Sequence, residues 1–158
     1  MLVGKFMRIA IEKAKEGIEF GQEPFGACVV KDGKVISVSH NTVFADSDVT
    51  AHAEMNAIRE ACKKLKTIDL QGCEIYATFK PCPMCHAACD RANISIIYYG
   101  VGPEDFGDKV RKIVTNITPG ILREECIELV KKRYSQKSTF PQAEAKFKSN
   151  FFSRTTPK

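Results

Sequence analysis

Residues 73–99 read CEIYATFKPCPMCHAACDRANISIIYY, a strand, a break, a short helix and a second strand in succession. Aromatic and β-branched side chains between Cys73 and Phe79 favour a strand. The Pro-Cys-Pro that follows ends this strand, and Pro83 suits the first turn of a helix because a backbone N–H there has no partner within the helix. We therefore predict a helix from Pro83 to about Arg91, followed by the most apolar strand of the chain, Ile94 to Tyr99.

Two helices and a hairpin are predicted on the N-terminal side of this stretch. Residues 2–19 carry apolar side chains at steps of three and four, which predicts a one-sided helix. These side chains are Val3, Phe6, Met7, Ala10, Ala14 and Ile18. Two β-rich runs, Ala27 to Val30 and Val35 to Val38, flank an Asp-Gly pair, which is a strong hairpin signal. Ala51 to Leu65 predicts the second helix, with Thr50 as its N-cap.

The C-terminal side predicts a weaker strand, Lys112 to Ile117, and a helix from Leu122 to about Tyr134. The resulting order of helices and strands favours a three-layer α/β/α sandwich with a mixed central sheet of about five strands. We assign residues 1–134 to this domain. Residues 135–158 form a basic tail with several phenylalanines, and we expect it to dock on the domain or on a partner subunit.

The charge of the chain is unevenly distributed. The 158 residues carry 24 Lys plus Arg against 19 Asp plus Glu, a formal net charge of +5. Residues 131–158 hold 8 of these basic side chains and 1 acidic one, whereas residues 1–130 hold 16 basic and 18 acidic ones. Any argument for phosphate binding therefore concerns the end of the chain.

Nothing in the sequence predicts a membrane or secreted protein. No apolar run approaches the roughly 18–20 residues that span a bilayer, and the N-terminus lacks the apolar core of a signal peptide. The chain has 7 cysteines, an odd number, which in this context indicates reduced thiols or metal ligands. We expect a cytoplasmic protein.

Three side chains of the metal-ligand type lie where two predicted helices begin. Cys82 and Cys85 have the Cys-x-x-Cys spacing that lets two thiolates bind one tetrahedral zinc ion, and His52 offers a neutral nitrogen. The start of a helix favours thiolates because its N–H groups and dipole stabilise anionic sulfur. Three protein ligands leave a fourth position for water, which is typical of catalytic zinc sites, where the pKa of that water falls to about 7.

Glu54 follows His52 by two residues, about 200° around the predicted helix. Its carboxylate therefore points away from the direction of His52 and is better placed beside a bound water than on the metal. In that position it can accept the proton of the water and return it to a substrate nitrogen.

Each of these residues has a simpler interpretation when taken alone. Cys-Pro-x-Cys also occurs in thioredoxin-type redox pairs and as two buried thiols, and a glutamate near a helix start complements the helix dipole. The combination of His-x-Glu with Pro-Cys-x-x-Cys is more specific, since it is the pattern of zinc deaminases that act on nucleobases. Cys89 is expected to be a packed thiol, and His86 a residue of the pocket rim or the surface.

Over about residues 3–134 the sequence resembles the cytidine and deoxycytidylate deaminase superfamily. The matching motifs are Pro24-Phe25-Gly26-Ala27, Lys31-Asp32-Gly33, His40-Asn41, Thr50-Ala51-His52-Ala53-Glu54 and Pro81-Cys82-Pro83-Met84-Cys85. The resemblance implies that the zinc ligands are His52, Cys82 and Cys85, and that Glu54 carries protons. It also implies that Asn41, Phe25 and Ala53 contact the base, and that the protein is a homodimer.

Within this superfamily the chain is similar to both bacterial guanine deaminases and tRNA-specific adenosine deaminases. Pro24-Phe25-Gly26 resembles the guanine enzymes, whereas residues 117–126 resemble the C-terminal helix region of the tRNA enzymes. The loop that the tRNA enzymes place after the fourth strand is shortened here to residues 102–108. Lys80 also departs from the family pattern, which often has Glu before the Pro-Cys pair.

These features lead us to expect a small-molecule substrate, an amino-bearing nucleobase or nucleoside, with guanine favoured. The main alternative is adenosine in tRNA, which would need the basic tail to bind phosphates. Cytosine or cytidine is a further alternative. From a different class, the chain could be a non-catalytic, zinc-stabilised RNA-binding module, although Glu54 argues against that interpretation.

Overall fold

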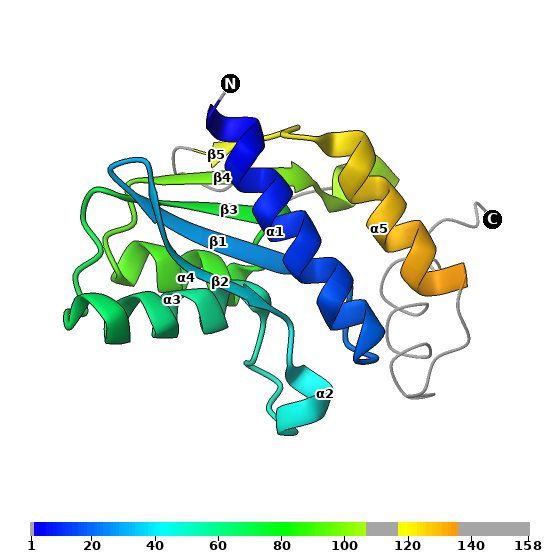
Figure 1. The fold of residues 1–158 in the computed structure, drawn as a ribbon, viewed down its shortest axis with the longest axis horizontal. Coiled ribbons are helices and arrows are strands. Elements are labelled where there is room, and N and C mark those ends of the chain that lie inside the picture. Colours follow the sequence, from blue (N-terminus) through cyan, green and yellow to red (C-terminus); the bar gives the residue numbers. More distant parts are fainter. Residues whose placement is uncertain (1, 107–116, 136–158) are drawn as a thin grey trace.

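The computed structural model describes residues 2–106 and 117–135. Along the chain, each described helix directly precedes or follows a strand of one sheet (Figure 1). The helices are α1 (Leu2–Glu19), α2 (Val43–Asp46), α3 (Ala53–Leu65), α4 (Pro83–Arg91), the 3-10 turn η1 (Pro103–Phe106) and α5 (Arg123–Ser135).

The sheet has five strands in the order β2-β1-β3-β4-β5, which confirms the predicted mixed sheet. β1 is antiparallel to both of its neighbours, whereas β3, β4 and β5 are parallel. The strands are β1 (Gly26–Lys31), β2 (Lys34–His40), β3 (Cys73–Phe79), β4 (Ile96–Val101) and β5 (Ile117–Thr118). The Asp32-Gly33 turn joins β1 to β2, with positive φ at both residues, as a hairpin of this kind requires.

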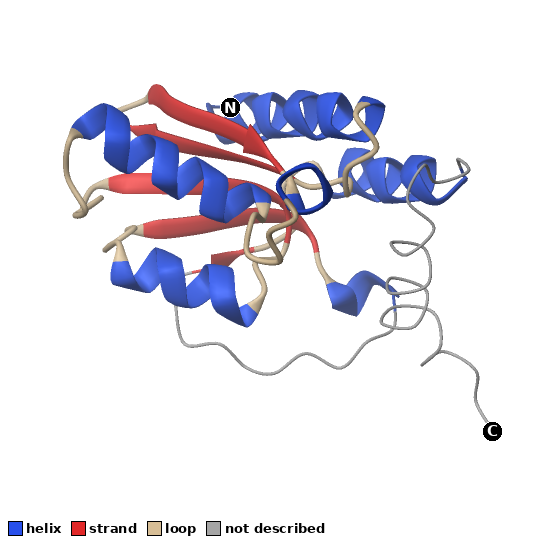
Figure 2. Ribbon diagram, turned by 90° about the horizontal axis from the view of Figure 1, so that it is seen from below, coloured by secondary structure: helices blue, strands red, loops and turns tan. Residues whose placement is uncertain are grey.

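Helices cover both faces of the sheet, which confirms the three-layer α/β/α sandwich (Figure 2). α1 and α5 lie side by side on one face, where Met7, Ala10 and Ala14 are fully buried. α3 and α4 pack on the other face through small side chains such as Ala53, Ala57 and Ala61. The 3.6-residue period of α1 and the alanine-rich face of α3 thus determine which side of each helix meets the sheet.

Some predicted boundaries were wrong. The N-cap of α3 is His52 and not Thr50, because the Thr50 hydroxyl instead donates to the Asp48 carboxylate at 2.7 Å within the preceding loop. The strand predicted at Ile94 to Tyr99 begins and ends two residues later, at Ile96–Val101. Most of the strand predicted at residues 112–117 lies outside the described residues, as does the tail after residue 135, so the division into domain and tail stays a prediction. No described helix combines the length and apolarity needed to cross a membrane.

The strand directions bring the segments of interest to one edge of the sheet. β2, β3 and β4 run the same way, so their carboxyl ends, at His40, Phe79 and Val101, lie together. The start of β1 lies at the same edge, since Gly26 pairs with His40. In open α/β sheets this edge is where ligands bind.

Gly26 lets α1 approach the sheet at this edge. A Cβ at Gly26 would overlap the Ala10 carbonyl oxygen and lie 2.9 Å from the Ala14 nitrogen, and both are backbone atoms of a helix. We expect Gly26→Ala to lower the free energy of unfolding by about 3 kcal/mol, as overpacking of a rigid core does. Denaturant unfolding measures this loss.

Gly4→Ala on α1 is the matched control, because nothing lies within 4 Å of a Cβ at Gly4. There the same change should stabilise the helix by up to about 1 kcal/mol. Equal stabilities for the two variants would show that α1 does not press on Gly26.

Candidate metal centre and active site

Two helix N-termini meet at the sheet edge and present the candidate ligands. His52 is the N-cap of α3 and Cys82 is the N-cap of α4, both in extended backbone conformations and both without a side-chain capping bond. Pro83 occupies the first turn of α4, as predicted, and Cys85 follows one turn into the helix. The side chains of the two N-cap residues, the His52 imidazole and the Cys82 thiol, therefore point toward each other and not toward the helix backbone.

The distances among these three side chains fit zinc. His52 Nδ1 lies 3.7 Å from Cys82 Sγ and 3.6 Å from Cys85 Sγ. All three donor atoms lie within 4.8 Å of one another. Zinc bonds of about 2.0–2.1 Å to nitrogen and about 2.3 Å to sulfur, at a tetrahedral angle, place the nitrogen and sulfur about 3.6 Å apart. The structure thus brings together the three residues that the sequence singled out, with Nδ1 as the nitrogen that faces both sulfurs.

The two thiols differ in their protonation. A hydrogen bond from the Cys85 thiol lowers the pKa of Cys82 to about 4, and the His52 ring and the Cys85 N–H act in the same direction. That same hydrogen bond, together with burial, raises the pKa of Cys85. Cys82 is therefore the thiol of the pair that ionises more readily, and the thiolate is the form that binds zinc.

Glu54 is buried beside the three donors and is not one of them. It is the second residue of α3, with 7% of its surface exposed. Burial raises the pKa of its carboxyl to about 7, and the Cys85 thiol lies within hydrogen-bonding reach. A carboxyl with such a pKa can both accept and release a proton near neutral pH, which is what an acid–base group requires.

The residues predicted to contact a base come from three segments at this edge of the sheet: the residues before β1, those after β2, and the start of α3. The Asn41 N–H donates to the Phe25 carbonyl at 3.0 Å, and Asn41 Oδ1 accepts the Val43 N–H at 3.2 Å. Phe25 is partly buried, with its ring centroid 5.3 Å from that of Phe79. Ala53, the first residue of α3, is fully buried in the core. The roles of these three residues stay predictions.

Asn56 is a residue that the sequence did not single out. Its side-chain amide donates to the His40 carbonyl at 3.1 Å, to Thr42 Oγ1 at 2.9 Å and to the Ala51 carbonyl at 3.4 Å. Asn56 thereby ties the segment after β2 to the segment before α3. An asparagine four residues after a helix N-cap gives no local signal of this function, because its partners become neighbours only in the fold.

The two other candidate ligands on α4 lie elsewhere. Cys89 has 1% of its surface exposed and packs in the core under α3, which confirms the packed thiol. His86 is not a surface residue, since only 8% of it is exposed. Its Nδ1 lies 3.4 Å from the Asp90 carboxylate, and Nε2 finds no hydrogen-bond partner among the described residues.

A three-layer sandwich with a His, Cys, Cys cluster at two helix N-termini and a buried glutamate beside it defines the class of zinc-dependent hydrolytic deaminases. The family model of the cytidine and deoxycytidylate deaminase zinc-binding region matches residues 3–101. The chain therefore belongs to this family, which also confirms the predicted zinc cofactor and the assignment as an enzyme.

Three similar proteins represent two kinds of deaminase. The tRNA-specific adenosine deaminase of Aquifex aeolicus is 43% identical over 105 residues, which cover 66% of this chain and 70% of that protein. The guanine deaminase of Bacillus subtilis is 42% identical over 101 residues, which cover 63% of this chain and 65% of that protein. A solved structure from a study of tRNA:A34 deaminases superposes with a TM-score of 0.71 at 35% identity, covering 79% of this chain and 98% of that one.

Proposed function

We propose that this protein removes an amino group from a nucleobase ring by hydrolysis, with His52, Cys82 and Cys85 as zinc ligands and Glu54 as the proton carrier. The observation that carries the proposal is the meeting of three donor atoms at tetrahedral spacing with a buried carboxyl that is not one of them. A structural zinc site would need no such carboxyl and would be closed by a fourth protein ligand.

The chemistry divides between the metal and the chain. His52, Cys82 and Cys85 would hold a zinc ion, which would lower the pKa of a water molecule and so supply hydroxide for attack on the ring carbon at neutral pH. Glu54 accepts the proton of that water and delivers it to the ring nitrogen next to the attacked carbon. Glu54 then takes the remaining hydroxyl proton to the leaving amino group, so that the carbon–nitrogen bond breaks and ammonia departs while a carbonyl remains.

The pocket residues hold the ring in place for this transfer. Asn41 presents its side-chain amide to the edge of the base, and its carbonyl oxygen is already fixed by the Val43 N–H. Phe25 forms an apolar wall that excludes water from one face of the ring. The backbone N–H of Ala53, at the first position of α3, has no partner within the helix and offers a further donor.

Adenosine in tRNA is our first candidate substrate, and guanine is the second. The sequence favoured guanine, and that preference rests on residues 24–26 and on the shortened loop at residues 102–108. The similarity to the Aquifex tRNA enzyme and to the tRNA:A34 deaminase structure extends over 66% and 79% of this chain, and it supports an RNA substrate. The 42% identity to the Bacillus guanine deaminase makes guanine the second candidate substrate. None of the three similar proteins described above is named a cytosine or cytidine deaminase.

The basic end of the chain would supply the phosphate contacts that an RNA substrate needs. Arg133 is not part of this surface, because it is 4% exposed and its Nε donates to the Gln22 carbonyl at 3.2 Å. Lys131 and Lys132, on the exposed side of α5, and the basic residues beyond 135 remain for phosphates. The cytoplasmic location and the homodimer are predictions that still need their own tests.

The substrate is tested by ammonia release from zinc-loaded protein on guanine, cytosine, adenine, their nucleosides and tRNA. We expect tRNA to be the best substrate, with inosine as its product. Truncation after residue 134 should lower the affinity for tRNA at least about tenfold and flatten its salt dependence, because each lost phosphate contact removes counterion release.

The ammonia-release panel distinguishes the two candidates. If guanine is turned over and tRNA is not, the second candidate replaces the first. If zinc-loaded protein releases ammonia from no member of the panel, the proposed function is wrong, and the non-catalytic RNA-binding module becomes the better interpretation.

A further inference from the structure

Lys80 lies in the segment that joins the sheet to the candidate metal centre. It directly follows β3 and precedes Cys82 by two residues, and its N–H donates to the Val101 carbonyl at the end of β4 at 2.8 Å. Its side chain is only 14% exposed, and Nζ lies 5.5 Å from the centroid of the Tyr99 ring. A lysine that is buried to this extent needs a partner for its charge.

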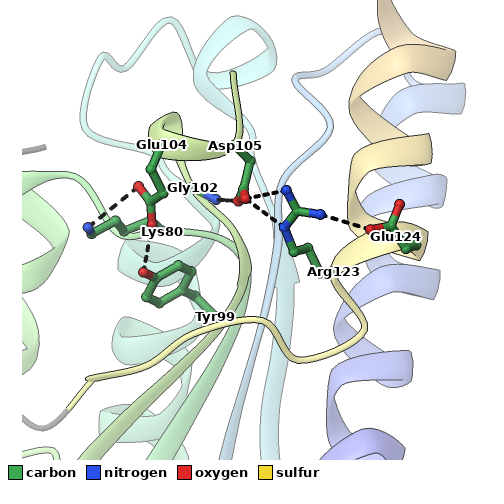
Figure 3. A network of polar contacts seen from close by, with 7 residues as sticks. All are labelled: Lys80, Tyr99, Gly102, Glu104, Asp105, Arg123 and Glu124. Carbon is green, nitrogen blue, oxygen red and sulfur yellow. Dashed lines mark hydrogen bonds and ion pairs between the residues drawn. The ribbon is translucent and has the colours of Figure 1, made fainter. Parts of the chain in front are cut away.

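That partner is Glu104, in the turn η1 (Figure 3). Glu104 Oε2 lies 3.7 Å from Lys80 Nζ, and Oε1 accepts the Tyr99 hydroxyl at 2.8 Å. One carboxylate thus bridges a residue of the segment that leads to Cys82 and a residue of β4. Tyr99 contacts both members of the pair, because its ring lies beneath the Lys80 ammonium and its hydroxyl donates to the Glu104 carboxylate.

The next residue, Asp105, fixes the same turn from the other side. Its carboxylate accepts the Gly102 N–H at 2.7 Å and Arg123 Nε at 2.6 Å, so that η1 is also held to the start of α5 (Figure 3). A Cβ at Gly102 would lie 2.5 Å from both oxygens of Glu104. The position therefore has room for the Glu104 carboxylate only because residue 102 has no side chain.

The turn ends in an aromatic ring that reaches the pocket wall. Phe106 stacks on Phe79 with ring centroids 6.3 Å apart and planes 14° apart. Phe79 in turn contacts Phe25 at 5.3 Å. The three rings form a continuous series from η1 to the residue that we propose as a wall of the base pocket.

We propose that Lys80 and Glu104 are a positioning pair for the base pocket. Their ion pair holds η1 against the ends of β3 and β4, which keeps Phe106 stacked on Phe79 and thereby sets the position of the Phe25 ring. This inference rests on the proposed function, since it assigns the pair to the binding of the base. Neither residue touches the reacting atoms.

The arrangement predicts an effect on binding rather than on the chemical step. The rings contact the face of the base in the ground state and in the transition state alike, so loosening them raises KM and leaves kcat nearly unchanged. The zinc ligands and Glu54 stand on α3 and α4 and keep their positions. Loss of this pair should therefore not change the zinc content.

Three substitutions disturb the pair in different ways. Lys80→Met removes the ammonium, Glu104→Gln removes the negative charge, and Gly102→Ala displaces the carboxylate without altering either residue. We expect each to raise KM by about five- to tenfold, with kcat within about twofold, for whichever member of the panel the wild type deaminates. Lys80→Arg keeps the ion pair and should stay within about twofold in KM. Lys15→Met removes the lysine of an exposed ion pair with Glu12 on α1 and should leave both constants unchanged.

The direction of the Glu104→Gln effect separates positioning from phosphate binding. If Lys80 served to bind phosphate, Glu104→Gln would release its charge for the substrate and lower KM, whereas Lys80→Met would raise it. A positioning pair requires both variants to raise KM. Opposite effects, or an unchanged KM in all three variants, would overturn the proposal.

A readout that does not depend on activity keeps this test apart from that of the proposed function. The chain has no tryptophan, so Phe106→Trp introduces a single tryptophan at the end of the turn, whose emission can be excited selectively. Adding Lys80→Met to this background should shift its emission to longer wavelength as the ring loses its stack and meets water. An unchanged emission would contradict the positioning. A shifted emission in a protein that deaminates no member of the panel would support the positioning and contradict the proposed function.

Discussion

A Glu54→Gln variant is expected to keep its zinc and to lose about 10²- to 10⁴-fold in kcat, the contribution typical of a positioned acid–base group. The amide has the shape of the carboxyl but cannot accept the proton of the water or return it to the ring and the leaving amine. Because Glu54 is buried and lies outside the set of three donors, the metal should remain in place. Ammonia release and zinc content, measured on the same preparation, test both halves of this expectation.

Glu60→Gln is the control for this change on the same helix. Glu60 lies on α3 and forms an ion pair with Lys64 at 2.8 Å, away from the donors. The control should retain the kcat of the wild type. A Glu54→Gln variant that keeps more than about a tenth of wild-type kcat would be inconsistent with proton transfer by Glu54.

A Cys85→Ala variant is expected to lose zinc and all measurable deamination. Cys85 Sγ is fully buried and lies 3.6 Å from His52 Nδ1, so its removal leaves two donors for a tetrahedral ion. Without the metal no hydroxide forms at neutral pH, and we expect the rate to fall at least about a thousandfold, to background. The variant should also lose the stabilisation that zinc gives the wild type, because a metal that binds only the folded chain raises its stability.

Cys89→Ala is the matched control, one turn further along α4. Cys89 is as buried as Cys85 but packs in the core and is not among the three donors. It should cost about 1 kcal/mol in unfolding free energy through the small cavity, with full zinc and activity. Zinc content by elemental analysis and thermal unfolding with and without zinc distinguish the variants. Equal zinc in both would show that Cys85 is not a ligand.

Local patterns in the sequence predicted most of the fold. The bounds of α1, β3 and α4 are the predicted ones, because a helical period, a β-rich run and a Pro-Cys-Pro break each mark their own ends. The start of α3 was wrong by two residues because the Thr50 hydroxyl is engaged by Asp48. The short helix α2 and the turn η1 were not predicted. Both are fixed by partners far along the chain, such as Gln22, whose carbonyl oxygen Oε1 accepts the Phe44 N–H at 3.2 Å.

The residues of the candidate site were likewise predicted from the sequence only where the signal is local. His52, Cys82 and Cys85 were singled out from local features, namely a Cys-x-x-Cys spacing and two helix starts, together with the combined deaminase pattern. The Lys80–Glu104 pair and the Asn56 amide were not found, because their partners come together only through the order of strands in the sheet. The sequence favoured guanine from residues 24–26 and the shortened loop at residues 102–108, whereas a tRNA-specific enzyme is among the similar relatives, at 43% identity over 105 residues.

The fold explains why these groups meet. Three strands end at the edge where β1 begins, and each connection at that edge carries part of the site. The segment before β1 carries Phe25, the connection from β2 to α3 carries Asn41 and His52, and the connection from β3 to α4 carries Lys80 and Cys82. The turn after β4 adds Glu104, so the candidate ligands and the proposed pocket residues lie on connections of the same sheet.

The most direct test of a zinc-dependent deaminase is a reconstitution series. Zinc is removed from the wild type with a chelator and returned in steps, and ammonia release from the panel is measured against zinc bound per chain. We predict no release from the zinc-free protein and a linear rise that ends at one zinc per chain, with Glu54→Gln binding the same zinc and releasing almost no ammonia. Ammonia release that does not depend on bound zinc, or none at full occupancy, would contradict this account.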